Sequence, residues 1–180
     1  MTDNDIELIK NSIRNVPDFP KPGIQFKDIS TLLSDPVAFD CAVKAMEELA
    51  RRTGFSKIAA CESRGFVFGS AMAHDMHVPL VMVRKKGKLP GETVSQEYEL
   101  EYGTDSIEVT RQSLCKGDKV LVVDDLVATG GTAIATCSLV EKCGAEVAGV
   151  VCLVELPDLG GSETISKKHP FSAVVKYSGK

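Results

Sequence analysis

The sequence predicts an α/β fold: a single domain built on a twisted parallel sheet flanked by helices. Four apolar runs are typical of buried parallel strands, at residues 57–61, 80–84, 119–124 and 146–154. Helical patterns stand before or between these runs, which is the alternation expected of a parallel sheet with helices on both faces. The 180 residues are enough for one sizeable core. The ends of the strands are therefore the first place to look for a site.

The composition is that of an ordinary globular protein, with 43% hydrophobic and 26% charged residues. The net charge of −4 argues against a nucleic-acid partner. The 6 cysteines form no C-x-x-C pair, so we expect reduced core thiols in a cytoplasmic protein, without disulfides or a zinc site. The polar start, Thr2–Glu7, does not resemble a signal or transit peptide, and no apolar run is long enough to predict a membrane partner.

The N-terminal part is predicted to be a short helix followed by a stiff loop. Ile6, Ile9, Ile13 and Val16 repeat at helical spacing. The prolines between residues 17 and 23 then break regular structure. A longer helix should open at Asp35, next to Pro36, and close at Gly54, whereas residues 172–176 form a final edge strand.

Residues 92–111 change to the alternation of a two-stranded hairpin. Apolar side chains should lie on one face of its first strand and acidic ones on the other: Tyr98, Leu100 and Tyr102 against Glu97, Glu99 and Glu101. The hairpin has too little apolar surface to be predicted as core. It is either a lid that keeps water from a reaction centre or an exposed edge hairpin whose charges oppose aggregation.

The stretch from Val120 to Thr132 carries the clearest functional pattern. An apolar strand ends in Asp124 and Asp125, and a turn rich in glycine leads into a helix. The free N–H groups of a helix N-terminus bind anions, and glycines let the backbone approach them. The turn has neither the lysine of a Walker loop nor a G-x-G-x-x-G pattern. Two adjacent carboxylates suit vicinal hydroxyls near a phosphate, so we predict a sugar phosphate; the alternative is an ordinary turn capped by the aspartates.

This stretch resembles the 5-phosphoribosyl-1-pyrophosphate (PRPP) signature of the type I phosphoribosyltransferases. The resemblance implies that Asp124 and Asp125 bind the ribose hydroxyls. It also implies that the loop after them binds the 5-phosphate, through Ala128, Thr129, Gly130, Gly131 and Thr132.

Two more loops resemble that family. Residues 62–66, with the sequence Glu-Ser-Arg-Gly-Phe, resemble its pyrophosphate loop, which implies that Ser63 and Arg64 bind pyrophosphate and that the Glu62–Ser63 peptide is cis. The basic turn at residues 84–88 implies a place for Lys88 near the pyrophosphate, and for Arg84 in the active site of the partner subunit of a homodimer. From the residues alone, two alternatives remain: Arg64 forms only a surface salt bridge, and residues 84–88 are only a solvated charged turn.

The N-terminal loop and the hairpin resemble the adenine-specific members. At Gln25, Phe26 and Lys27 the resemblance implies that the aromatic ring stacks on the purine while backbone groups on either side read its edge. The alternative is that Phe26 only anchors the loop. The sequence of residues 100–103, Leu-Glu-Tyr-Gly, resembles a lid motif, which implies that Glu101 is the catalytic proton acceptor.

The resemblance covers nearly the whole chain, in family order. It implies one domain at residues 1–180, with a hood at about 1–34, a core at 35–180 and a lid at about 92–111. The implied reaction transfers the phosphoribosyl group of PRPP to adenine, giving AMP and pyrophosphate, with Mg²⁺ held mainly by PRPP and no direct protein ligand. Two alternatives stay open: another purine such as xanthine or hypoxanthine, and a non-catalytic PRPP-sensing regulator.

Overall fold

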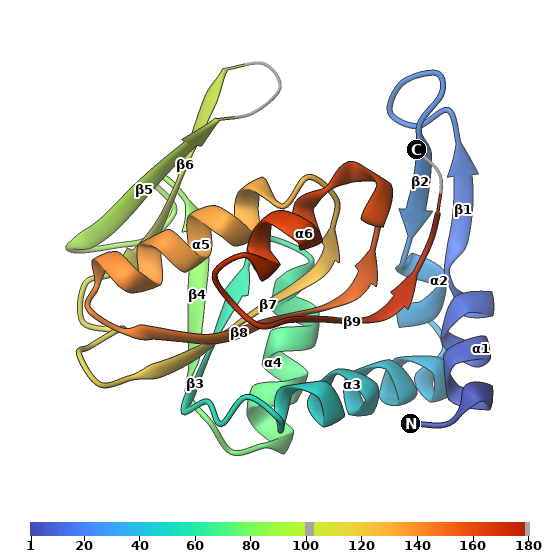
Figure 1. Ribbon diagram of the computed structural model, residues 1–180, viewed down its shortest axis with the longest axis horizontal. Helices are drawn as coiled ribbons and strands as arrows, with labels where there is room; N and C mark the ends of the chain where they lie inside the picture. The colour runs from blue at the N-terminus through green and yellow to red at the C-terminus, as the bar shows by residue number, and fades with distance from the viewer. Residues whose placement is uncertain (100–102, 179–180) are drawn as a thin grey trace.

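The computed structural model describes residues 1–99 and 103–178. Its centre is a seven-stranded sheet in the order β5-β6-β4-β3-β7-β8-β9 (Figure 1). The strands of this sheet are β3 (Lys57–Cys61), β4 (Leu80–Lys85), β5 (Thr93–Glu99), β6 (Thr104–Thr110), β7 (Lys119–Val127), β8 (Glu146–Glu155) and β9 (Phe171–Lys176). Five neighbouring strands, in the order β4-β3-β7-β8-β9, pair in parallel, whereas β6 pairs antiparallel with both β4 and β5. The predicted α/β class and the predicted edge strand are therefore confirmed.

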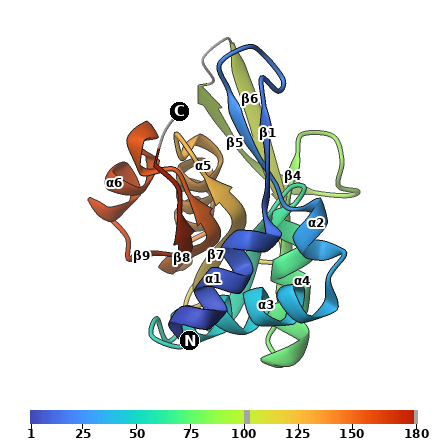
Figure 2. The same cartoon turned by 90° about the vertical axis from the view of Figure 1, so that its right-hand side faces the viewer.

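Helices cover both faces of the sheet. They are α1 (Asp3–Ser12), α2 (Ser30–Leu33), α3 (Pro36–Ala50), α4 (Gly65–Asp75), α5 (Gly131–Lys142) and α6 (Gly161–Ser166), with a short 3-10 helix η1 (Pro157–Leu159). Figure 2 shows α5 and α6 on one side and α1, α3 and α4 on the other. One core, with Met46, Phe68 and Leu121, lies under α3 and α4, and a second, with Val122 and Leu139, lies under α5. Alternate residues of β7 thus face different helices.

β7 is longer than predicted. Its ladder with β8 continues through Asp124, opposite Cys152, to Val127, opposite Glu155. The prediction that the strand ends at the two aspartates is therefore wrong. Pairing with a long neighbouring strand keeps the backbone extended there, although the side chains are charged.

The N-terminal helix is shorter than predicted. α1 ends at Ser12, and β1 (Arg14–Pro17) pairs antiparallel with β2 (Gln25–Asp28), so that Val16 lies opposite Phe26. The residue before a proline is disfavoured in helical conformation, which explains why Val16 leaves the helical pattern. The result is a separate two-stranded hairpin that places Phe26 away from the main sheet.

The base of the second hairpin is part of the core, contrary to prediction. Ile107 and Val109 of β6 are 2% and 0% exposed because β6 extends the sheet beside β4. Lys142 Nζ of α5 donates to the Ser95 carbonyl at 2.8 Å, which fixes β5 against that helix. Both hairpins project past the side of the sheet at which the parallel strands end, one hairpin at each end of that side (Figure 1). The carboxyl ends of β3, β4 and β7 lie at this edge because the three strands are parallel.

The 6 cysteines are free thiols. Cys61, Cys137 and Cys152 are buried, and burial raises the pKa of Cys137 to about 12. Cys115 is exposed, so the prediction that these residues are core thiols is wrong for this one, which lies in the turn before β7. Within the described ranges, none of the helices has the length and hydrophobicity needed to span a membrane.

Candidate active site

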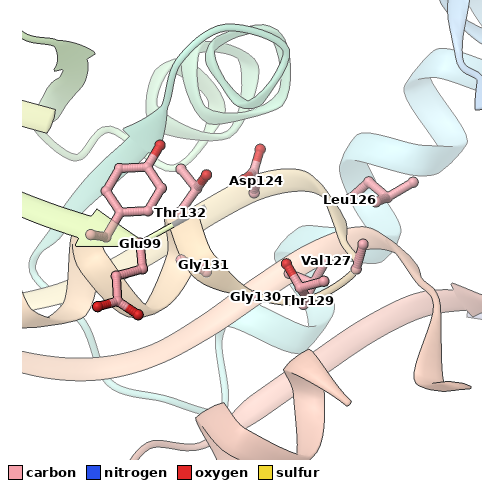
Figure 3. A pocket seen from close by; sticks show the side chains of 11 residues that line it. Glu99, Asp124, Leu126, Val127, Thr129, Gly130, Gly131 and Thr132 are labelled. Carbon is pink, nitrogen blue, oxygen red and sulfur yellow. The ribbon is translucent and has the colours of Figure 1, made fainter. Parts of the chain in front are cut away.

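A cavity of about 670 Å³ lies where β7 passes into α5. Its floor is the loop from Val127 to Thr132, and its wall is formed by Tyr98 and Glu99 at the end of β5 (Figure 3). Asp124 contributes to the same cavity. The predicted phosphate loop and one predicted ribose carboxylate are thus brought together.

The N-terminus of α5 is open to an anion. Gly130 precedes the helix with φ of 80°, a left-handed conformation that strongly favours glycine. Gly130 has no side chain to cap this N-terminus, whereas the side chains of Thr2 and Asp35 cap those of α1 and α3. The first amides of α5 therefore point into the cavity without an intrahelical acceptor, and the helix dipole favours negative charge there.

A glycine from a distant part of the chain supports this loop from behind. Gly161, at the start of α6, donates its N–H to the Ala128 carbonyl at 3.1 Å. A Cβ on Gly161 would stand 2.3 Å from that oxygen and 2.6 Å from Gly130 N, so only glycine fits. Sequence reasoning missed this residue. The Gly160-Gly161 pair after β8 was the available signal, because paired glycines often mark a close backbone approach.

The two aspartates are buried next to each other. Asp124 Oδ1 accepts the N–H of Asp125 at 2.9 Å, and the residues are 9% and 4% exposed. Burial, reinforced by the charge of its neighbour, raises the pKa of Asp124 well above its usual range. Burial also raises the pKa of Asp125, although Arg64 opposes that shift. Such carboxylates have lost hydration and would gain from hydroxyl donors of a ligand.

Arg64 links the predicted ribose and base sites. Its Nε lies 3.0 Å from Asp125 Oδ2, an ion pair whose angles do not meet those of a hydrogen bond. Its guanidinium carbon lies 5.2 Å from the centre of the Phe26 ring. The Glu62–Ser63 peptide before it is cis, as predicted. Gly65 then lets α4 approach β7, since a Cβ there would stand 3.0 Å from Val123 O and from Asp124 Oδ1.

Phe26 lies in a second cavity of about 420 Å³, between the N-terminal hairpin and Arg64. The Phe19 ring meets it edge-on, with centroids 5.1 Å apart, and is 51% exposed. An exposed aromatic side chain in this loop was not predicted to take part. A flat apolar surface edged by a guanidinium is suited to a planar heterocycle.

The side chains beside Phe26 are engaged elsewhere. Gln25 Oε1 accepts from Asn15 Nδ2 at 2.6 Å, and Lys27 Nζ donates to Asn15 Oδ1 at 2.8 Å. Lys27 Nζ also lies 4.6 Å from the centre of the Tyr177 ring. Because alternate residues of a strand face opposite sides, the side chains of residues 25 and 27 point away from the Phe26 cavity, which neither residue lines.

The basic turn after β4 is held by contacts within the chain. Arg84 Nε lies 3.3 Å from Glu62 Oε2, and Arg84 Nη1 donates to the Lys88 carbonyl at 3.0 Å. Partial burial raises the pKa of Glu62, but the Lys85 N–H and the Arg84 guanidinium outweigh it and leave that pKa lowered. Glu62 thus ties the turn to the loop that carries Ser63 and Arg64. Glu101 lies outside the described residues, two positions beyond Glu99.

Comparisons with known proteins show which family the chain belongs to. A family model for the phosphoribosyl transferase domain matches residues 32–177. The adenine phosphoribosyltransferase of Maricaulis maris is 46% identical over 172 residues, which is 95% of this chain and 98% of that protein. The chain belongs to the adenine phosphoribosyltransferase family.

Solved adenine phosphoribosyltransferases have the same fold. The crystal structure of the Rhodothermus marinus protein has a TM-score of 0.91 at 44% identity, covering 98% of this chain and 100% of that chain. The Saccharomyces cerevisiae protein, solved with an imino-altritol bisphosphate and adenine, has a TM-score of 0.90 at 34% identity, covering 97% and 100%. The mixed sheet with its two projecting hairpins is therefore the fold of adenine phosphoribosyltransferases.

Proposed function

We propose that the cavity at the start of α5 binds PRPP and that the protein transfers its 5-phosphoribosyl group to adenine, releasing AMP and pyrophosphate. The observation that carries this proposal is that the N-terminus of α5, which begins at a glycine, lines one cavity with the buried Asp124, and that the buried Asp125 is its neighbour. Membership of the adenine phosphoribosyltransferase family supports the reaction. The yeast relative solved with a bisphosphate and adenine supports the base.

Each half of the PRPP site has its own physical role. The amides and hydroxyls from Ala128 to Thr132 bind the 5-phosphate, and Asp124 and Asp125 accept the ribose hydroxyls. Anchoring the sugar at both ends fixes its C1 atom for in-line attack. The desolvated carboxylates also favour positive charge, which grows on the ribose as the bond to pyrophosphate lengthens.

Pyrophosphate is assigned to the neighbouring loops, through Ser63, Arg64 and Lys88. Arg64 offers a planar fork of donors and pairs with Asp125, so a pyrophosphate that it binds would lie next to the proposed ribose site. Lys88 adds a positive charge from the turn that Glu62 ties to this loop. These groups offset the negative charge that develops as pyrophosphate leaves.

Adenine is assigned to the cavity under the N-terminal hairpin. Phe26 stacks on the ring, and the backbone at Gln25 and Lys27 reads its edge. Glu101 is the proposed acceptor of the purine proton. In the sequence it follows Glu99, which lines the PRPP cavity, by two positions. Residues 1–34 then serve as the hood, residues 92–111 as the lid, and the 35–180 segment as the core.

Mg²⁺ fits this site as an ion that arrives with PRPP. In the described residues, no group of three or more His, Cys, Asp or Glu side chains is placed to hold a metal. Mg²⁺ keeps several waters and commonly binds through substrate phosphates rather than in an all-protein cage, so PRPP itself would supply most of its ligands here. When bound, the ion would offset the charge of the leaving pyrophosphate.

A homodimer is proposed from the surface of β4. Leu80 and Met82 lie on one face of this strand and are 37% and 47% exposed, on the same face as Arg84. A second subunit that covers them would bring its own Arg84 close to this edge of the sheet. The free thiols suit the reducing cytoplasm, where we place the protein.

The test measures turnover of PRPP with each of four bases: adenine, hypoxanthine, guanine and xanthine. The release of pyrophosphate is the readout. We expect adenine to be preferred by at least about 100-fold in kcat/KM, because an edge read by hydrogen bonds discriminates strongly. Preference for an oxopurine would move the assignment to another base. PRPP binding with no turnover of any base would favour the alternative that the protein is a non-catalytic regulator that senses PRPP.

A further inference from the structure

Glu108 is a buried acid with no role in the reaction described above. It lies in β6 opposite Arg84 of β4 and is 4% exposed. Its Oε1 accepts the N–H of Gly87 at 3.0 Å and that of Leu89 at 3.2 Å. Its Oε2 accepts the hydroxyl of Thr93 at 3.1 Å. All these donors are neutral, and no ion pair involves Glu108 in the described part of the chain.

These donors lie on both sides of Lys88. Gly87, with φ of 80°, turns the chain just before it, and Leu89 follows it directly. The Lys88 N–H donates to the Lys85 carbonyl at 3.2 Å, and its carbonyl accepts from Arg84 Nη1 at 3.0 Å. The backbone of Lys88 is thus fixed on every side, and Glu108 supplies the acceptor that closes the turn.

The third donor belongs to the lid. Thr93 is the first residue of β5, so one carboxylate joins the basic turn to the root of the hairpin that β5 and β6 form. A carboxylate can accept several hydrogen bonds at once, and those to an ionised acceptor are stronger than neutral ones. A buried charge that is bonded in this way is costly to remove or to leave partly satisfied.

We propose that Glu108 is a positioning residue that holds the turn at residues 85–91 and the root of the lid in one arrangement, so that the Lys88 ammonium meets pyrophosphate. This rests on the proposed role of Lys88. Glu108 itself contacts no substrate. Its effect on the reaction passes through the backbone on either side of Lys88.

The experiment compares Glu108→Ala, Glu108→Gln, Lys88→Ala and the double variant Lys88→Ala/Glu108→Ala. The alanine variant at 108 should raise the KM for PRPP about tenfold while the KM for adenine changes less than about twofold, since only the pyrophosphate side loses its alignment. Glu108→Gln retains an Oε1 acceptor for both amides and should recover most of the PRPP affinity. In the double variant, loss of Glu108 should add little to the loss of Lys88.

Several outcomes would overturn the inference. An equal rise in the KM for PRPP in Glu108→Gln and Glu108→Ala would mean that the negative charge of Glu108 matters and that its hydrogen bonds do not. If the rise in the KM for PRPP in the double variant equals the product of the rises in the two single variants, Glu108 acts independently of Lys88, which contradicts the inference. An unchanged PRPP KM in Lys88→Ala would remove the proposed role of Lys88, and this inference with it, whereas an effect in Lys88→Ala with none in Glu108→Ala would remove this inference alone. If Glu108→Ala does not fold, Glu108→Asp, which is one methylene short, replaces it with the same expectations.

Discussion

The N–H of Gly161 donates to the carbonyl of Ala128 at 3.1 Å, and this contact joins the start of α6 to the phosphate loop. The two backbones are so close that a methyl group on Gly161 would overlap the Ala128 oxygen. The loop that should bind phosphate therefore depends on a residue about 30 positions further along the chain, outside the signature.

Gly161→Ala should displace the phosphate loop, residues 128–132, and weaken its binding of the 5-phosphate. We expect the KM for PRPP to rise at least about tenfold, because a shift of about 1 Å in a positioning group is costly. Steady-state kinetics with PRPP varied at saturating adenine measures it. Glu163→Ala, an exposed change in the same helix, is the control and should leave the KM unchanged. A normal KM in Gly161→Ala would show that the loop does not need this support.

Asp124→Asn should make the protein more stable at neutral pH while weakening PRPP binding. Because the folded-state pKa of Asp124 is raised, the wild-type protein loses stability as pH rises from the unfolded value of 3.8 through the folded pKa. Asparagine does not ionise, so the difference in the free energy of unfolding should be near zero below about pH 4 and should grow above it. A gain of about 1 kcal/mol would raise Tm by about 2–4 °C.

Urea unfolding at a series of pH values, with calorimetry of PRPP binding, tests that prediction. Asp3→Asn, at an exposed position of α1, is the matched control and should show no such gain. A variant that is less stable than wild type at pH 7, or a difference that shrinks as pH rises, would mean that the carboxylate is not strained by burial.

Glu101→Gln should lower kcat about 100-fold and leave PRPP affinity nearly intact, because the variant loses only a proton acceptor. Glu97→Gln, an exposed change in the same hairpin, should have no effect. The measurement is kcat with both substrates saturating, together with PRPP titration by calorimetry. Full turnover in Glu101→Gln would move the proton acceptor elsewhere.

Arg84 can be tested by subunit mixing. If it serves the partner's site, inactive Arg84→Ala and an inactive Asp125→Asn protein should form mixed dimers with one intact site. A random mixture should regain about a quarter of wild-type activity, since half of the dimers are mixed and each has one complete site of two. Mixtures that stay inactive would assign Arg84 to its own subunit, where it already contacts Glu62.

The sequence was sufficient for those parts of the fold where local pattern and burial agree. The runs that became β3, β4 and β8 are apolar, and the three loops beyond parallel strands had to meet at one edge. Asp124, Asp125 and the 128–132 loop could be found because they are contiguous. The ends of α1 and β7 were missed because Pro17 and the β8 ladder override the helical spacing and the charged side chains.

Other features depend on contacts between distant residues and leave little local signal. Gly161 and Glu108 act on backbone that is about 20 or more positions away in the sequence, through distances that only the folded chain fixes. Arg64 was expected at pyrophosphate, and its pairing with Asp125 and its place over Phe26 come from the packing of α4 on β7. These are the residues for which structure adds most to the sequence.

A crystal structure with AMP is the most direct test of the central claim. We expect the phosphate to be bound by the backbone N–H groups at the start of α5, from Thr129 to Thr132, with the ribose hydroxyls on Asp124 and Asp125. A phosphate bound anywhere else, with the amides at the start of α5 left free, would contradict it.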